Sequence, residues 1–294
     1  MVACHYIDNP LLVDGFKVDL RIYVAITSMH PLRLYIYKEG LTRFATSKYS
    51  RSGQGSKYMH LTNYSINKTS PGFVDNKDAN VDDQGSKWSL SALWEYLRQR
   101  KIDERLIWSR IKDIIVKTII SMESSSTAAF EMYVPYRNSC FELLGFDILI
   151  DDMLNPWLLE VNLSPSLNCD SPLDLKIKSK LISDLFNLAG VPSKKEPKRV
   201  KNTKPKKKPT WNPSTLAMDS SNENDLMFES NLSVEERNVL KESDAELNRM
   251  GNFERIFPTP VAYLYRQFFD EERPLNTLLC SKICGVYRRD LRNV

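Results

Sequence analysis

Two apolar segments separated by a short turn dominate the middle of the chain, Phe146-Asp147-Ile148-Leu149-Ile150-Asp151 and Trp157-Leu158-Leu159-Glu160-Val161-Asn162. β-Branched and aromatic residues on both sides of a turn favour two strands paired as a hairpin. A turn centred between residues 153 and 154 places Asp147 directly opposite Glu160. Because side chains two residues apart on a strand share a face, Glu160 and Asn162 should point the same way.

Three oxygen-bearing side chains should therefore meet on one side of this hairpin, those of Asp147, Glu160 and Asn162. Hard oxygen ligands of this kind suit Mg²⁺, which proteins commonly hold through one or two carboxylates together with substrate phosphates. The alternative is a pair of carboxylates at the surface of an edge hairpin. Like charges placed directly opposite each other destabilise a strand pair without a cation, and this favours the metal site.

Further strands are predicted on the N-terminal side of the hairpin. β-Branched and alternating stretches indicate strands over Asp19–Ser28, Leu32–Tyr37 and Leu41–Lys48, the last two joined by a turn at Lys38-Glu39-Gly40. On the first strand, Lys17, Asp19 and Arg21 share one face, where they could grip phosphates and a ribose hydroxyl. An exposed strand face that alternates in charge would show the same pattern.

Helices are predicted between and after these strands. Ser89 and Asp103 are placed to cap two helices, and Leu173–Ala189 predicts a third helix that ends at Gly190. The segment His60–Lys68 has neither helical nor strand periodicity but is dense in hydroxyl and amide groups. Such a polar loop is either a turn or a ligand-binding loop.

The distribution of charge divides the 294 residues into three parts, although the net charge is only +4. Residues 1–192 are neutral overall, residues 193–209 carry nine basic residues against one glutamate, and residues 210–294 are acidic. The basic stretch contains three prolines and no large apolar residue except Val200, so we expect a linker. We therefore divide the chain into a globular unit at 1–192, a linker and loop at 193–230 and a helical extension at 231–294.

Several protein classes are excluded. The chain has no apolar run long enough to span a membrane and no secretory signal at its N-terminus. Five scattered cysteines do not form a disulfide framework and suggest a reducing, intracellular compartment. No zinc-ligand spacing, nucleophile elbow, P-loop or dinucleotide-binding glycine motif occurs, and Cys280 and Cys284 lack a second ligand pair.

The ordered set of motifs resembles the tubulin tyrosine ligase-like family. The segments that carry the resemblance are Tyr6–Leu12, Lys17–Arg21, Arg43–Ala45, His60–Ser65, Lys87–Trp88, Gly145–Asp147 and Leu159–Ser166. It covers residues 4–191 densely and continues weakly to Glu254–Thr259. Within the family, Val13–Lys17 and Leu163–Leu167 look most like the polyglutamylases that start side chains on tubulin.

The resemblance implies an α+β fold, the C-terminal part of an ATP-grasp domain with an antiparallel sheet and flanking helices. It assigns Asp147, Glu160 and Asn162 to magnesium. The remaining positions match nucleotide contacts (Lys17, Asp19, Thr62, Asn63), contacts to the incoming amino acid (Arg43, Ser65, Lys87, Lys178) and a phosphate-facing arginine (Arg21). We expect Lys17 and Arg21 to be catalytic because they neutralise phosphate charge.

The implied activity is ATP- and Mg²⁺-dependent ligation of glutamate to tubulin. A γ-carboxylate of a tubulin tail attacks the ATP γ-phosphate, and the amine of free L-glutamate displaces phosphate from the acyl phosphate. The expected partners are tubulin or microtubules and free L-glutamate, and we expect neither a membrane nor a nucleic-acid partner. We expect a monomer in the cytoplasm, located on microtubules and at cilia or basal bodies. The basic stretch would dock on acidic microtubules, or it would be a solvated linker, a nuclear-localisation signal or a nucleic-acid patch. The helical extension at 231–294 is a second candidate for contact with microtubules.

One departure from the family pattern concerns the start of the chain. Family members carry an N-terminal domain and a further ATP-binding lysine before the segment that matches Tyr6–Leu12, and Cys4 stands where relatives usually have glutamine. We therefore expect an N-terminally truncated ligase. The alternatives are a catalytically incomplete fragment that only binds tubulin, and a glycine ligase of the same family, against which Arg43 and Lys178 argue.

Overall fold

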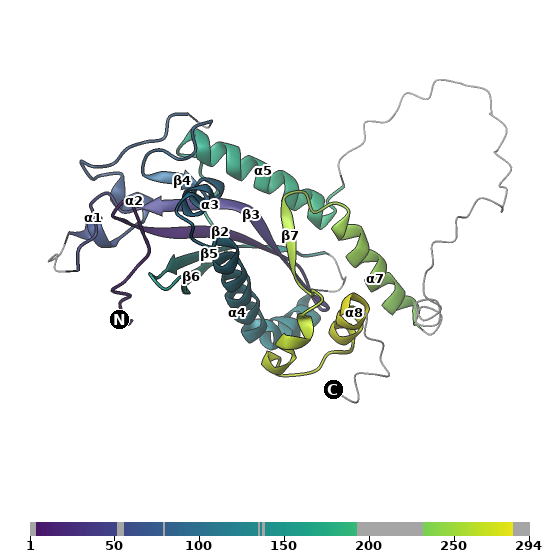
Figure 1. The fold of residues 1–294 in the computed structure, drawn as a ribbon. Helices are drawn as coiled ribbons and strands as arrows, with labels where there is room; N and C mark the ends of the chain where they lie inside the picture. The colour runs from purple at the N-terminus through teal and green to yellow at the C-terminus, as the bar shows by residue number, and fades with distance from the viewer. Residues whose placement is uncertain are drawn as a thin grey trace, which may run out of the picture.

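The computed structural model describes residues 4–51, 56–78, 80–134, 136, 139–192 and 232–284, and its centre is an antiparallel sheet (Figure 1). Neighbouring strands follow in the order β4 (Lys87–Ser89), β3 (Leu32–Phe44), β2 (Phe16–Met29), β5 (Glu142–Ile150) and β6 (Pro156–Asn162). In addition, β1 (Leu12–Val13) pairs with β2, and β7 (Phe253–Phe257) pairs with β3. The α+β class expected from the sequence is confirmed.

The β5–β6 hairpin has the predicted pairing of Asp147 with Glu160. Near the turn, however, Ile150 pairs with Pro156 and Ile148 with Leu158, which is one residue out of that register. A bulge between the two regions, with one additional residue on β6, brings Glu160 opposite Asp147. The pairing that matters for the site is thus confirmed, although it arises from a shorter turn and a bulge together.

The second predicted hairpin, with a turn at Lys38-Glu39-Gly40, is wrong. These residues lie within β3, which runs without a turn from Leu32 to Phe44. A Cβ atom on Gly40 would lie 2.5 Å from the backbone oxygen of Arg21 on β2, so only glycine allows the two strands to approach here. The glycine permits a close contact inside the sheet, and the register shifts on its N-terminal side.

Helices cover the two faces of the sheet unequally (Figure 1). On one face, α3 (Leu90–Gln99) and α4 (Glu104–Tyr133) pack in the main core against residues such as Leu20 and Ile22. On the other face, α5 (Pro172–Ala189) packs its leucines against Tyr23, Tyr35 and Tyr37. By strand alternation, Lys17, Asp19 and Arg21 share this second face with Tyr23, toward the other end of β2.

The predicted helix caps are present. The side chain of Ser89 accepts a hydrogen bond from the backbone nitrogen of Ala92, and Asp103 accepts from those of Arg105 and Leu106. At the end of α5, Gly190 adopts a left-handed conformation with φ of 73°. The segment His60–Lys68 includes the end of the short helix α1 (Lys57–His60) and all of α2 (Tyr64–Asn67), with irregular residues between them.

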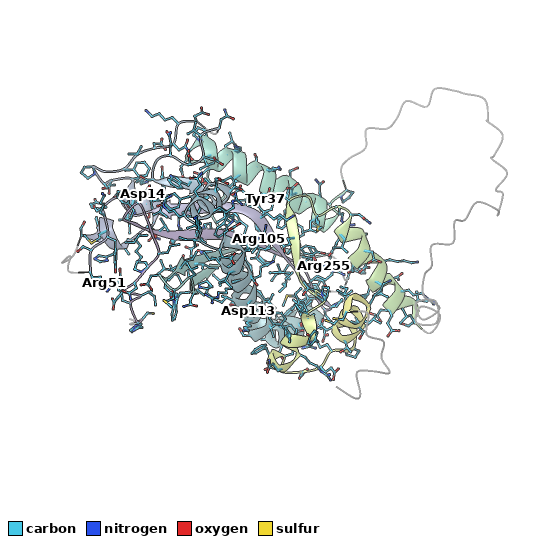
Figure 2. All side chains as sticks on the ribbon, in the orientation of Figure 1. Asp14, Tyr37, Arg51, Arg105, Asp113 and Arg255 are labelled. Atoms are coloured by element: carbon cyan, nitrogen blue, oxygen red, sulfur yellow. The ribbon has the colours of Figure 1, made fainter. Side chains whose placement is uncertain are left out.

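The C-terminal segment returns to the sheet. It contains α7 (Val234–Leu247), β7, the 3-10 helix η1 (Ala262–Phe268) and α8 (Pro274–Cys284). β7 pairs with the first half of β3, so a strand is present where the sequence pattern indicated only helical or irregular structure. Figure 2 shows the side chains of Tyr37 and Arg255 in this region, and the Arg255 guanidinium donates to the hydroxyl of Tyr35 at 3.1 Å.

Three further expectations concern the linker, the cysteines and membrane spans. The linker at 193–230 and its basic stretch lie outside the described residues. All five cysteines are free, as expected. Among the helices that the structure describes, none combines the length and apolar character that a membrane span requires.

Candidate active site

Charged side chains form a row across the face of the sheet on which α5 packs. The row contains Lys87, Arg43, Asp19, Arg21, Asp147 and Glu160, contributed by β4, β3, β2, β5 and β6 in that order. The sheet register pairs Arg43 with both Lys87 and Asp19, and it pairs Asp147 with both Arg21 and Glu160. Sequence motifs that are far apart along the chain therefore meet in one place.

Two arginines and two aspartates link the centre of this row. Arg43 donates from Nε and Nη2 to both oxygens of Asp19, at 2.7 and 2.5 Å, and the same Nη2 donates to Asp147 Oδ2 at 2.7 Å. Arg21 approaches Asp147 from the other side, with Nη2 at 3.2 Å from Oδ2. Bidentate contacts of this kind hold the guanidinium planes in fixed orientations.

The electrostatic environment favours the charged forms of Asp147 and Arg43. Burial alone would raise the pKa of the Asp147 carboxyl, but the hydrogen bonds and charges of Arg21 and Arg43 outweigh burial and lower that pKa. For Arg43, burial opposes the charge, while Asp19 and Asp147 raise the pKa of the guanidinium. The cluster is therefore a pre-formed array of fixed charges of both signs.

Gly145 allows the loop after β6 to close over this cluster. A Cβ atom at this position would lie 2.7 Å from Cβ of Pro165 and 3.3 Å from Cδ of Arg21. Any side chain would therefore push apart the loop and the arginine. The glycine and the proline belong to two different motifs of the sequence, and their contact explains why both accompany the charged residues.

The polar segment around α1 and α2 contributes one direct contact to the row. Thr62 is buried and donates from its hydroxyl to Asp19 Oδ2 at 2.8 Å. The amide of Asn67 supports the loop by donating to the backbone oxygen of Leu61 at 2.7 Å. Asn63 and Ser65 are exposed, and within the described part of the chain their side chains make no recorded hydrogen bond.

Lys17 lies buried beside Asp19 at one edge of the cluster. Its ammonium is 4.8 Å from the centre of the Tyr6 ring and 3.4 Å from the Tyr6 hydroxyl. Burial lowers the pKa of Lys17, and the nearby charge of Asp19 opposes this shift without cancelling it. A lysine with a desolvated ammonium in this position gains by pairing with an anion.

Lys87 and Lys178 meet at the other edge of the row through Asp174. Lys87 Nζ is 2.5 Å from Asp174 Oδ2, and Lys178 Nζ is 3.1 Å from Asp174 Oδ1. Asp174 did not emerge from the sequence analysis. The serine three residues before it, Ser171, is the N-cap of α5 and accepts from the Asp174 backbone nitrogen, so a capping pattern could have identified the carboxylate.

The outer end of the row is the most exposed part. Glu160 is exposed, and its Oε1 accepts a hydrogen bond from Asn162 Nδ2 at 3.2 Å. The same amide nitrogen is 3.2 Å from the backbone oxygen of Gly145. No recorded ion pair of the described residues involves Glu160, so its negative charge has no basic partner there.

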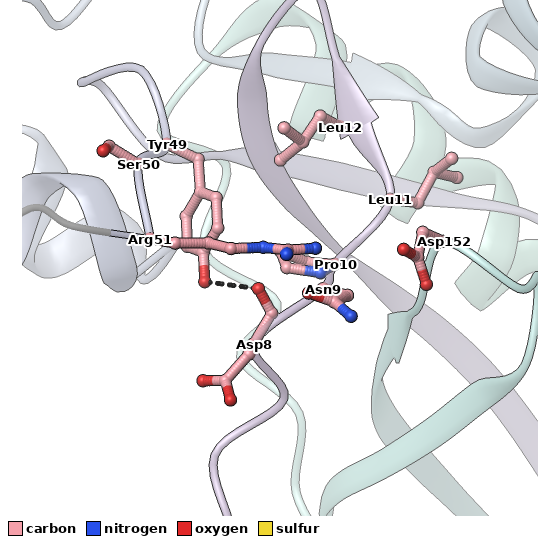
Figure 3. Close-up of a pocket in the computed structure, with 9 residues that line it drawn as sticks. All are labelled: Asp8, Asn9, Pro10, Leu11, Leu12, Tyr49, Ser50, Arg51 and Asp152. Carbon is pink, nitrogen blue, oxygen red and sulfur yellow. Dashed lines mark hydrogen bonds between the residues drawn. The ribbon is translucent and has the colours of Figure 1, made fainter.

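A separate cavity lies near the N-terminal residues, outside the charged row (Figure 3). Its volume is about 400 Å³, and its lining is formed by Asp8, Asn9, Pro10, Leu11, Leu12, Tyr49, Ser50, Arg51 and Asp152. In the close-up, the Tyr49 hydroxyl donates to the backbone oxygen of Asp8 at 2.9 Å. None of the site residues predicted from the sequence lines this cavity.

Comparisons with known proteins agree with the motifs. Residues 1–199 match the tubulin-tyrosine ligase family. The chain is 41% identical over 309 residues to mouse "Tubulin polyglutamylase TTLL5", which covers 96% of this chain and 23% of the relative. It is 42% identical over 304 residues to human "Tubulin monoglutamylase TTLL4", and this match covers 95% of the chain and 25% of the relative. It is 37% identical over 295 residues to Caenorhabditis elegans "Tubulin polyglutamylase ttll-4", with 95% of the chain and 48% of the relative covered.

These matches cover most of this chain but only part of each relative. The chain spans about a quarter of the length of the mouse and human relatives. The similarity nevertheless extends over both the charged row and the C-terminal segment that returns to the sheet. The chain belongs to the tubulin-tyrosine ligase family.

Proposed function

We propose that this chain forms part of an ATP-dependent glutamate ligase that modifies the acidic C-terminal tails of tubulin. The observation that carries the proposal is the linked cluster of Asp19, Arg43, Asp147 and Arg21, which lines up fixed charges of both signs on one face of the sheet. Phosphoryl transfer and amide formation need such an array, because catalysis rests on positioning and on neutralising phosphate charge. The names of the relatives support tubulin as the substrate.

The reaction would proceed in two steps on the substrates. A carboxylate oxygen of the tubulin tail attacks the γ-phosphorus of ATP, the bond to ADP breaks, and an acyl phosphate forms. The amine of L-glutamate then attacks the acyl carbon, loses a proton and displaces phosphate. Lys17 and Arg21 would neutralise the phosphates, while Asp19, Thr62 and Asn63 would contact the nucleotide. Their fixed orientation reduces the reorganisation that the reaction requires.

Mg²⁺ would be held by Asp147, Glu160 and Asn162. These residues fit a hard cation, because the two carboxylates occupy paired positions on β5 and β6, and Glu160 has no basic partner among the described residues. Asp147 is already neutralised in part by Arg21 and Arg43, so Glu160 supplies most of the unbalanced charge. When bound, Mg²⁺ would supply a Lewis acid that polarises the phosphates.

The incoming amino acid would be a dicarboxylic one. Arg43, Lys87 and Lys178 provide positive charge toward the β4 edge of the row. Ser65 lies exposed on α2 next to Tyr64, whose ring is 4.5 Å from Lys87 Nζ. Guanidinium and ammonium groups pair with carboxylates, which favours glutamate over glycine. Competition between labelled glutamate and excess unlabelled glycine tests this preference, and efficient displacement by glycine would contradict it.

The central experiment is ATP-dependent incorporation of labelled glutamate into tubulin. We expect incorporation by the chain with Mg²⁺ and ATP, and its loss in the Asp147→Ala variant. A matched control is Asp151→Ala. Asp151 is a buried carboxylate directly after β5, the strand that carries Asp147, but it binds the turn and Trp157 and lies outside the charged row. Incorporation that survives Asp147→Ala would contradict the proposed function.

A second candidate function is tubulin binding without catalysis. It is favoured by the concentration of positive charge in residues 193–209, because acidic tubulin tails attract such a segment. Replacing Lys204, Lys206, Lys207 and Lys208 by glutamine should weaken cosedimentation with microtubules, most clearly at low salt. Unchanged binding would rule out this electrostatic docking. For either function, we propose that the chain acts on cytoplasmic microtubules, including those of cilia and basal bodies. We further propose that it acts as a monomer and without a membrane or nucleic-acid partner.

A further inference from the structure

One buried carboxylate lies between the two lysines assigned to the incoming amino acid. Asp174 has no exposed surface, and it is located in the first turn of α5. Its Oδ2 accepts from Lys87 Nζ and from the hydroxyl of Ser171 at 3.0 Å. Its Oδ1 lies 3.1 Å from Lys178 Nζ, close enough for an ion pair although not aligned for a hydrogen bond.

The carboxylate stays ionised in this buried position. Burial would raise the pKa of Asp174, but the hydrogen bond from Lys87 and the charges of Lys87 and Lys178 outweigh it and lower that pKa. The N-terminal end of α5 also favours a negative charge. Asp174 is therefore a permanent anion that keeps two cations close to it.

Each lysine has a second fixed contact that determines where its ammonium points. Lys87 extends over the ring of Tyr64 at 4.5 Å, and Lys178 donates to the backbone oxygen of Asn168. Lys87 comes from β4 and Lys178 from α5, and Asp174 contacts the ammonium groups of both. Without the carboxylate, the two positive charges would repel each other and separate.

We propose that Asp174 is a positioning residue that holds the ammonium groups of Lys87 and Lys178 together as a clamp for one carboxylate of the incoming dicarboxylic amino acid. This inference rests on the proposed function. Two lysines and one aspartate leave one positive charge in excess, which matches one carboxylate. Asp174 itself touches no substrate, and it acts by fixing the separation and orientation of its two partners.

The test is direct binding of labelled L-glutamate to the full chain in the presence of ATP and Mg²⁺, measured by equilibrium dialysis. Asp174→Asn preserves the shape but removes the charge, and we expect glutamate to bind about 10-fold or more weakly, which corresponds to about 1.4 kcal/mol. Binding of a fluorescent ATP analogue should change less than about twofold. Asp184→Asn is the matched control, because Asp184 lies on the same helix and accepts from the Tyr37 hydroxyl and the Asn252 backbone nitrogen, away from the two lysines.

Further variants separate positioning from a loss of folding. Asp174→Glu retains the charge and should recover part of the glutamate affinity. In a double-mutant cycle, Asp174→Asn should add little to the effect of Lys87→Gln, because both changes disrupt the same clamp. Additive effects, or equal glutamate affinity in Asp174→Asn and the unaltered chain, would overturn the inference alone. No saturable glutamate binding by the unaltered chain would overturn the proposed function and this inference together.

Discussion

Two clusters of charged side chains lie toward opposite ends of β2 and β3, and they differ in how completely they are enclosed. In the first, Arg21 and Arg43 pair with aspartates and keep 14% and 12% of their side-chain surface exposed. In the second, Arg33 pairs with Glu246 of α7 at 3.2 Å and keeps 1%. Thr27 and Tyr35 donate to the same glutamate at 3.1 and 2.7 Å.

The two clusters are built from similar ion pairs but have different roles. The second, which we call the α7 cluster, is covered by the C-terminal segment, and Arg33 and Glu246 are buried within it. The first cluster belongs to the charged row of the candidate active site. That row ends at the exposed Glu160, so its side chains can exchange partners with a ligand. Similar ion pairs therefore stabilise the fold at one end of the sheet and leave a binding surface at the other.

The largest expected effect concerns the α7 cluster. Glu246→Ala would break a buried ion pair by removing the carboxylate that lies 3.2 Å from the Arg33 guanidinium, and we expect the free energy of unfolding to fall by about 3–5 kcal/mol. Urea denaturation measures the loss. Glu242→Ala is the control, because Glu242 lies on the same helix at 3.8 Å from Arg33 but is 32% exposed, and it should cost less than about 1 kcal/mol. Equal losses would contradict the distinction between the clusters.

The second prediction concerns Asp147 in the charged row, where we expect a large loss of activity and a smaller loss of stability. Asp147→Asn should reduce ATP-dependent glutamate incorporation by about 100-fold or more, because a fixed charge in the reaction site is lost. The free energy of unfolding should fall by less than for Glu246→Ala, since Arg43 keeps Asp19 and both arginines reach solvent. A variant that unfolds as readily as Glu246→Ala but retains activity would reverse the roles assigned to the two clusters.

The third prediction uses the lowered pKa of Lys17. Below that pKa, the folded chain carries the full cost of burying the ammonium, and the cost is relieved as pH rises toward the unfolded lysine value of about 10.4. Relative to Lys17→Met, the unaltered chain should therefore gain stability as the pH rises through this window. ATP binding by Lys17→Met should weaken about 10-fold at pH 7.5 because phosphate loses a cation.

Thermal unfolding at several pH values and binding of a fluorescent ATP analogue measure the two parts of this prediction. Lys112→Met is a suitable control for the pH series, because Lys112 is 30% exposed and lies outside the charged row. Parallel pH profiles for Lys17→Met and the unaltered chain would show that burial of this ammonium does not affect stability.

The smallest effect is expected at the surface of the β7 region. Lys112 pairs with Glu254 at 2.8 Å, but both side chains are about one-third exposed. Lys112→Ala should change the free energy of unfolding by less than about 0.5 kcal/mol, because solvent screens exposed pairs. A urea titration is sufficient for the measurement. A loss near that of Glu246→Ala would mean that surface pairs, rather than the α7 cluster, hold the C-terminal segment.

Local patterns were sufficient to predict much of the site. Strand alternation and the turn placed Asp147 opposite Glu160, and the caps at Ser89 and Asp103 follow from well-known preferences. The side-by-side position of Lys17, Asp19 and Arg21 also follows from the period of a strand. The roles of these residues in binding ATP, metal or glutamate stay predictions, because they come from the family resemblance.

The remaining features depend on contacts between distant segments. Gly40 resembles a turn glycine in sequence, but its neighbour is the backbone of Arg21 on another strand. The bridge from Arg43 to Asp147 joins residues 104 positions apart, and the Lys87–Asp174 pair joins residues 87 apart. No local periodicity encodes such contacts. A capping pattern can single out Asp174 as a helix-start residue, but its position between Lys87 and Lys178 and the continuity of the row depend on these long-range contacts.

The pairing of β7 with β3 has a consequence for how the chain folds. Tyr35 pairs with Arg255 across 220 positions, a separation that gives the fold a high contact order. Closing so long a loop before its contacts form should make folding slow. During synthesis on the ribosome, this edge of β3 also stays unpaired until β7 has been made. The match to the family model covers residues 1–199, but a fragment ending there would leave that edge unpaired and prone to aggregate.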